Sequence, residues 1–183
     1  MKRYGSRLPL VIGPIIAGTG LALFIRPDVG GSYWITFFPA IVVLGLGMAV
    51  SVVPLTTTVM NSVSENRAGI ASGINNAVSR TAGLLAIAVL GLVMFHAFNA
   101  CLDQRLDQVT PSVRVTLKEQ QIKLAAAEIP RGVDEKTRSA LKRSVNDCFV
   151  RGFRWVMAFG AVLSLASSLT SLILLEPRKR TAK

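Results

Sequence analysis

The chain has 183 residues, of which 51% are hydrophobic, and its formal net charge at pH 7 is +11. The hydrophobic residues occur in runs of about 18 or more with almost no charge, which are typical of membrane-spanning helices and exclude an ordinary soluble domain. The basic residues gather at the ends of these runs, as in membrane proteins, and no basic helix is interleaved with stacking aromatic residues. We therefore predict that the lipid bilayer is a partner of the chain and that nucleic acid is not.

Four apolar runs predict an all-α membrane protein with four transmembrane helices, because a helix satisfies its own backbone hydrogen bonds within lipid. In chain order these helices cover residues 8–25, 33–60, 68–98 and 152–175. Charged residues and breakers end the first and the last of them, at Arg26-Pro27-Asp28 and at Glu176-Pro177. The basic start of the chain is expected to open the first span and not to be a removed signal peptide, since no convincing cleavage pattern follows it.

The charges of the short connecting segments predict the orientation. The first seven residues, the segment 61–80 and the tail 176–183 are basic, whereas the turn after the first span balances Arg26 against Asp28. Basic short segments stay in the cytoplasm. Both termini and the segment 61–80 should therefore be cytoplasmic, and the long segment 99–151 should lie outside.

This outer segment is polar and carries helix signals. Thr110-Pro111 is typical of a helix start, and Asp134 can cap a second helix. Leu141, Val145 and Phe149 recur at a spacing that places them on one helical face. We expect a helical hairpin here, or a helical extension of the neighbouring spans.

The two cysteines of the chain lie near the two ends of the same segment, at Cys101 and Cys148. An outer compartment permits a disulfide between them. The sequence does not fix the separation of about 5.5 Å between Cα atoms that such a bridge needs. A disulfide and two free thiols both remain open.

Small residues recur along the third span, at Gly69, Gly73, Gly83 and Gly91. Small residues at such spacing let helix backbones approach closely in lipid, so we assign these glycines to helix packing. The alternative is that they let helices slide or rock during transport.

Polar residues at the ends of two spans are the candidates for function. They are Pro54, Thr57 and Asn61 at the end of the second span, and Asn75, Asn76 and Arg80 at the start of the third. Asn76 and Arg80 share a helical face. A charge near a span is a functional candidate, and the alternative is that Arg80 lies at the inner membrane edge and snorkels to it.

No Asp or Glu falls inside the four predicted spans. A proton-coupled exporter needs such a titratable group, so the chain alone is not expected to couple export to proton entry. The sequence also has no metal-ligand spacing, no phosphate-binding glycine loop and no nucleophile motif. We therefore expect neither an enzyme nor a bound metal or cofactor.

The stretch from Gly45 to Gly91 resembles the C-terminal half of the fourteen-helix drug:proton antiporter branch of the major facilitator superfamily. The resemblance rests on a span that ends in Pro54 and the hydroxyl residues up to Thr58, on the glycine-rich helix start from Ala68 to Gly73, and on the Asn75, Asn76 and Arg80 positions. Arg3-Tyr4-Gly5-Ser6-Arg7 also looks like the end of the basic loop signature that precedes helix eleven of such transporters.

The resemblance implies that the four spans correspond to helices eleven to fourteen, a partial C-terminal half of a multidrug efflux transporter in a bacterial inner membrane. It implies a small amphipathic or hydrophobic substrate, a gate near 61–80, and the missing transporter helices as partners, on the same longer chain or a separate one. Such a part is not expected to transport alone. The alternative is a stand-alone small four-helix membrane protein that acts as an oligomer or a scaffold.

Overall fold

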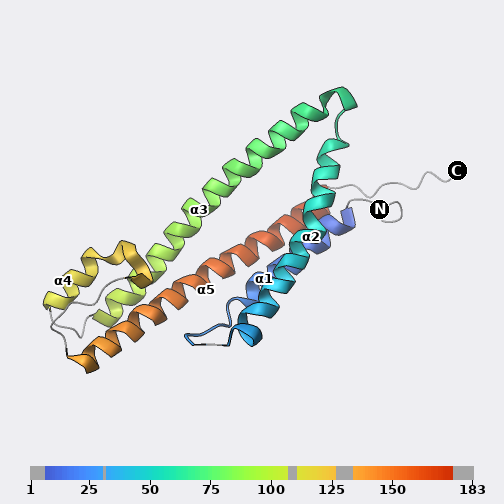
Figure 1. Ribbon diagram of the computed structural model, residues 1–183. Helices are drawn as coiled ribbons and strands as arrows, with labels where there is room; N and C mark the ends of the chain where they lie inside the picture. Colours follow the sequence, from blue (N-terminus) through green and yellow to red (C-terminus); the bar gives the residue numbers. More distant parts are fainter. Residues whose placement is uncertain (1–6, 31, 107–110, 127–133, 175–183) are drawn as a thin grey trace.

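The computed structural model describes residues 7–30, 32–106, 111–126 and 134–174, and all regular secondary structure in these ranges is helical (Figure 1). The α-helices are α1 (Arg7–Leu23), α2 (Phe38–Met60), α3 (Ala68–Leu106), α4 (Pro111–Glu119) and α5 (Glu135–Leu174). Three shorter elements complete the order: the π-helix η1 (Tyr33–Phe37) and the 3-10 helices η2 (Glu65–Arg67) and η3 (Gln121–Ala126).

Three helical stretches in the described ranges are long and apolar enough to cross a membrane: Tyr33–Met60, Glu65–Leu106 and Glu135–Leu174. They contain the second and third predicted spans and the fourth as far as Leu174, the last residue of it that the structure describes. The first predicted span is the shorter apolar helix α1, whose 17 residues extend about 26 Å. It ends at Leu23 and not at residue 25, because the amides of Phe24, Ile25 and Arg26 bond three residues back in a tightened last turn. Four spans are thus not established by length alone.

The helix α1 packs antiparallel against both α2 and α5. Its contact with α2 depends on glycines, since a Cβ atom at Gly13 would collide with Ser51 and one at Gly47 would collide with Ala17. On its other side, the Ser164 hydroxyl of α5 donates to the Pro14 carbonyl at 2.7 Å, and the Ser168 hydroxyl donates to the Val11 carbonyl at 2.8 Å. Close packing and interhelical hydrogen bonds of this kind hold helices together in lipid.

In the described residues of the predicted outer segment 99–151 no separate helical hairpin occurs. The helix α3 continues to Leu106, and α5 begins at Glu135, so the ends of two long helices extend into the segment, with α4 and η3 against them. This is the second of the two expected arrangements. The predicted boundary at residue 152 therefore falls within α5. Here the ends of α3 and α5 together with α4 and η3 are called the cap.

The cap contains the hydrophobic cluster of buried residues in the described part of the chain. Its members come from α3, α4 and α5: Phe98, Cys101, Leu102, Leu106, Val113, Leu117, Leu141, Val145 and Cys148. Phe149 packs against this cluster, in agreement with the face predicted from its spacing. Asp134 accepts a hydrogen bond from the Thr137 amide at the start of α5, as predicted for a capping residue, and hydrogen bonds from Thr137 lower the pKa of the Asp134 carboxyl. Thr110 lies outside the described residues.

Away from the cap, large apolar side chains are exposed along the three long helices, and only 11% of the most apolar window of each is buried. In water such a surface would be unfavourable, whereas lipid tails are as apolar as the side chains themselves. The fold therefore fits a membrane as its solvent.

Candidate functional site

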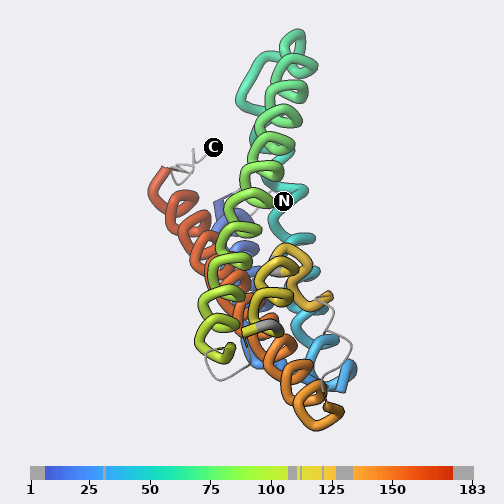
Figure 2. Tube along the Cα trace, turned by 90° about the vertical axis from the view of Figure 1, so that its left-hand side faces the viewer, coloured from blue at the N-terminus to red at the C-terminus, as the bar shows by residue number. Residues whose placement is uncertain are grey.

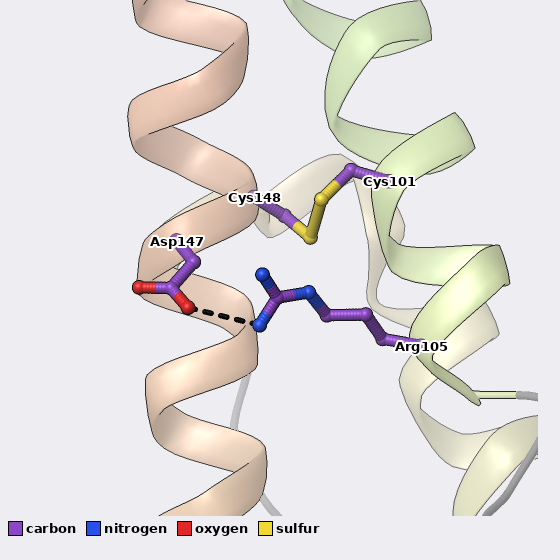
Figure 3. The surroundings of a disulfide bond; sticks show 4 residues. All are labelled: Cys101, Arg105, Asp147 and Cys148. Atoms are coloured by element: carbon purple, nitrogen blue, oxygen red, sulfur yellow. Dashed lines mark hydrogen bonds and ion pairs between the residues drawn. A yellow bond between two sulfur atoms is a disulfide. The ribbon is translucent and has the colours of Figure 1, made fainter.

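The helix α3 meets α5 along one face near the cap. Cys101 and Cys148 form a disulfide with their Cα atoms 5.4 Å apart, so the bridge is present and no free thiol occurs in the described residues (Figure 3). The Arg105 guanidinium donates to the Asp147 carboxylate at 2.9 Å, beside the bridge. At Gly152 a Cβ atom would lie 2.8 Å from the Met94 sulfur, so the two backbones approach closely there.

The same face of α3 continues beyond this contact. Met94, Phe98 and Cys101 are spaced three or four residues apart and therefore lie on one face of α3. Seven earlier residues of α3 continue this spacing and lie on the same face. These are Gly69, Gly73, Asn76, Arg80, Gly83, Ile87 and Gly91. Figures 1 and 2 show that α3 and α5 lie together at the cap and diverge toward the other end of the bundle, where α2 leads into α3.

The four glycines of this face have no neighbour within 4 Å of an added Cβ atom. They contrast with Gly47 on α2, where an added Cβ atom would collide with Ala17 of α1. The structure therefore does not bring Gly69, Gly73, Gly83 and Gly91 against any other described helix. Packing at these glycines would require a surface from outside the described residues.

The depth of Arg80 follows from the register of α3 against α5. Met94 lies opposite Gly152, and Arg80 is fourteen residues from Met94, or about 21 Å along α3. The end of α5 at Leu174 is twenty-two residues from Gly152, or about 33 Å. Counted along the two helices at 1.5 Å per residue, Arg80 is thus about 12 Å nearer to the Met94–Gly152 contact than the end of α5 is.

Arg80 is exposed, and no hydrogen bond or ion pair to it occurs within the part of the chain that the structure describes. Asn76 is exposed on the same face, one turn away. Asn75 is half-buried and, by its position, points to a different side of α3. Of the three predicted site residues on this helix, two therefore share the face that diverges from α5.

The predicted site residues of α2 make their hydrogen bonds within α2 itself. The hydroxyls of Thr56, Thr57 and Thr58 each donate to the carbonyl four residues earlier, at 2.7, 2.9 and 2.7 Å. These bonds use the hydroxyl hydrogens and leave the oxygens free to accept. Pro54 is buried inside α2, and the Asn61 amide closes the helix on the Thr57 carbonyl at 3.0 Å.

Within the described residues no side-chain hydrogen bond or ion pair joins Pro54, Thr57 or Asn61 to Asn76 or Arg80, although the short turn at η2 connects their helices. The candidates thus form two groups, one at the end of α2 and one on α3. In the described ranges no group of three His, Cys, Asp or Glu could hold a metal ion.

Sequence reasoning missed the contacts that hold α5 to the turn between α1 and α2. The Arg154 guanidinium donates to the Pro27 carbonyl at 3.0 Å and lies 3.8 Å from the Asp28 carboxylate. Phe24 packs edge-on against Phe153 beside them. A positive residue directly before Trp155 at the end of an apolar run was the signal available for this contact.

The fold and the exposed apolar helices define the class: in the residues that the structure describes, the protein is helical and has three helices long and apolar enough to span a membrane. Over 60% of its length the chain is 32% identical to the multidrug resistance protein Stp of Mycobacterium tuberculosis. Over 51% of its length it is 31% identical to the puromycin resistance protein pur8 of Streptomyces alboniger. Neither name is that of an enzyme.

These matches cover 20% of Stp and 19% of pur8, so the chain spans about a fifth of the length of the curated relatives it matches. No protein-family model and no solved structure matches the chain. The comparisons thus support a chain that is similar to part of two resistance proteins.

Proposed function

We propose that the chain is the C-terminal part of a secondary-active multidrug efflux transporter of the major facilitator superfamily, in its fourteen-helix drug:proton antiporter branch. The observation that carries this proposal is the α3 face with Asn76 and Arg80, which diverges from α5 and has no cover within the described chain. The partial similarity to two resistance proteins supports it.

In this proposal α1 also crosses the membrane, in addition to the three longer helical stretches, so that the chain has four spans. Its length of about 26 Å is slightly below the hydrocarbon thickness of about 30 Å. Arg7 begins α1 and donates to the Leu172 carbonyl near the end of α5 at 2.7 Å. A basic residue at the end of a short span can reach the polar boundary while its stem stays in lipid, which accommodates the mismatch.

The proposed topology places both termini in the cytoplasm of a bacterial cell and the cap outside. The basic residues of the N-terminal segment and the tail, together with Arg67 between α2 and α3, favour it. A disulfide in the cap also fits an oxidising outer compartment.

In alternating access, the end of α3 at the cap would stay fixed to α5, while the other end would move relative to the remaining transporter helices. At the cap, α3 is tied to α5 by the disulfide and the Arg105–Asp147 ion pair. Toward the other end it leaves α5, so Asn76 and Arg80 face the space that the remaining transporter helices would share. Transporters of this kind bind substrate at such an interface and rock one half against the other.

Proton coupling would need a carboxylate from outside these spans, because none of the spans contains Asp or Glu. The remaining helices would supply that group and most of the cavity for a small amphipathic or hydrophobic substrate. The second candidate function is a stand-alone oligomer or scaffold, which the uncovered α3 face would also allow if a second copy packed on it.

The test is an accumulation assay in the organism that encodes the chain, with variants introduced at the native locus. Arg80→Gln and deletion of the whole 183-residue stretch should both raise the intracellular accumulation of dyes, measured with a panel of fluorescent cationic and neutral dyes. Arg143→Gln, an exposed charge on the cap end of α5, should leave accumulation unchanged. If deletion raises accumulation and Arg80→Gln does not, the assigned pathway is wrong; if neither does for any dye, the efflux proposal is wrong.

A further inference from the structure

The turn between α1 and α2 presents an unusual apolar surface. Five large side chains around the π-helix η1 are exposed: Val29 (51%), Tyr33 (54%), Trp34 (70%), Ile35 (80%) and Phe38 (43%). The rings of Tyr33 and Trp34 lie 5.7 Å apart, and those of Trp34 and Phe38 lie 5.2 Å apart. The rings are thus held in contact with one another while one side of the group has no cover in the described chain.

This surface lies at the same level as the second tryptophan of the chain. Arg154 bonds to Pro27 in the turn and lies close to Asp28. The next residue, Trp155, is 54% exposed on α5. Exposed aromatic rings and basic side chains therefore occur at one level on two different helices, with Arg26 also exposed in the turn.

We propose that Tyr33, Trp34, Ile35 and Trp155, together with Arg26 and Arg154, form a collar that binds lipid at the boundary between headgroups and hydrocarbon. Tryptophan and tyrosine have an apolar ring and a polar tip and favour this boundary. A flat lipid surface requires such residues at one level on several helices, whereas a docked protein helix would need a continuous stripe along one of them. Lipid is therefore the partner that the arrangement fits.

The position of the collar on α5 also defines how much of this helix would lie in the hydrocarbon layer. Nineteen residues separate Trp155 from the end of α5 at Leu174, or about 29 Å, which equals the usual hydrocarbon thickness of about 30 Å. Leu174 and Arg7 then mark the opposite boundary, because Arg7 bonds to Leu172.

A consequence concerns Arg80. Trp155 is three residues beyond Gly152, so the collar level on α3 falls near Gly91, and Arg80 lies about 17 Å from it along the helix. Arg80 is then close to the middle of the hydrocarbon layer and not at its edge. The edge position expected from the sequence assumed that the whole apolar run to Phe98 lies in lipid, whereas Phe98 is buried in the cap.

The experiment uses the two tryptophans of the chain as depth reporters. Trp155→Phe leaves Trp34, and Trp34→Phe leaves Trp155, in purified full-length chain reconstituted into phosphatidylethanolamine and phosphatidylglycerol vesicles. Quenching is compared between lipids brominated near the headgroup, lipids brominated near the chain end, and aqueous iodide. Both single-tryptophan proteins should be quenched most strongly by the shallow bromines and should report the same depth.

A control protein carries Leu163→Trp with both native tryptophans changed to phenylalanine. Its tryptophan lies eight residues beyond Trp155, about 12 Å deeper, and should respond most to the deep bromines. The proposal is overturned if either native tryptophan is shielded from all lipid-borne quenchers, as a covering helix or second copy would cause. It is also overturned if iodide alone quenches one of them, or if their depths differ. None of these readouts depends on transport.

Discussion

Loss of the Cys101–Cys148 disulfide should open the cap far more often without unfolding the spans. The bridge closes a loop of 47 residues, and the chain-entropy relation gives about 4 kcal/mol for a loop of that size. Both helices that carry the cysteines are anchored in the membrane in our account, which already restricts the opened loop. About 4 kcal/mol is therefore the upper value, and the usual range of about 2–4 kcal/mol is the expectation.

The cap should persist after reduction, because Cys101 and Cys148 are buried among Phe98, Leu102 and Val145 and a free thiol packs as a small apolar group. What changes is the fraction of time it is open. At tenfold per 1.4 kcal/mol, a loss of about 4 kcal/mol raises that fraction by roughly 10³.

Limited trypsin digestion in micelles measures the effect, since cleavage follows the open population when reclosing is fast. The cap offers Lys118 and Lys123 as cleavage sites. The reduced wild type and the Cys101→Ala/Cys148→Ala variant should be cleaved in the cap at matching, faster rates than the oxidised protein. Equal cleavage rates for the oxidised and fully reduced proteins would refute the reasoning.

Three further predictions concern two contacts between helices and the capping of α5. Gly47→Leu should destabilise the α1–α2 contact by about 1–3 kcal/mol through overpacking, whereas Gly83→Leu, with no neighbour in the described chain, should leave the unfolding midpoint of the isolated chain in micelles unchanged and impair only the assembled protein. Ser168→Ala removes a hydrogen bond from α5 to α1 and should cost about 0.6–1.7 kcal/mol in the same unfolding assay. The pKa of Asp134 is lowered in the folded chain, so this carboxylate should stabilise the first turn of α5 fully at a pH above its unfolded pKa. The stabilisation should be lost as the pH falls through the lower pKa of the folded chain. Amide exchange at that turn measures the effect, and Asp134→Asn should show no such pH dependence.

The membrane class and the long helices were predictable from the sequence because apolar runs of this length have few other stable structures. The helical stretches that contain the second and third predicted spans begin at Tyr33, with η1, and at Glu65, with η2 directly before α3 at Ala68. The sequence could not determine that α5 begins as early as Glu135. A polar segment continues a helix when a partner helix covers one of its faces, and here α3 and α4 provide that cover.

The site was predictable only in part. The shared face of Asn76 and Arg80 follows from helical spacing, but the divergence of α3 from α5 along that face does not, since it depends on which helix packs against which. The same limit applies to small residues: Gly47 packs against α1 while Gly83 faces no described neighbour, although both are glycines within long apolar helices. The hydrogen bond from Arg154 to the Pro27 carbonyl joins residues 127 positions apart. No local sequence pattern indicates that Pro27 is the partner of Arg154.

The most direct test of the central claim is a cysteine scan of α3 in native membranes with a hydrophilic maleimide, the variants being encoded at the native locus. The two native cysteines are paired, so each introduced thiol is the reporter. Asn76→Cys, Arg80→Cys and Gly83→Cys should react, because thiols ionise where water lines a pathway, while Val78→Cys, Leu85→Cys and Val89→Cys on the opposite face should not. Equal reaction on both faces, or reaction on the opposite face alone, would contradict a transport pathway along this side of α3.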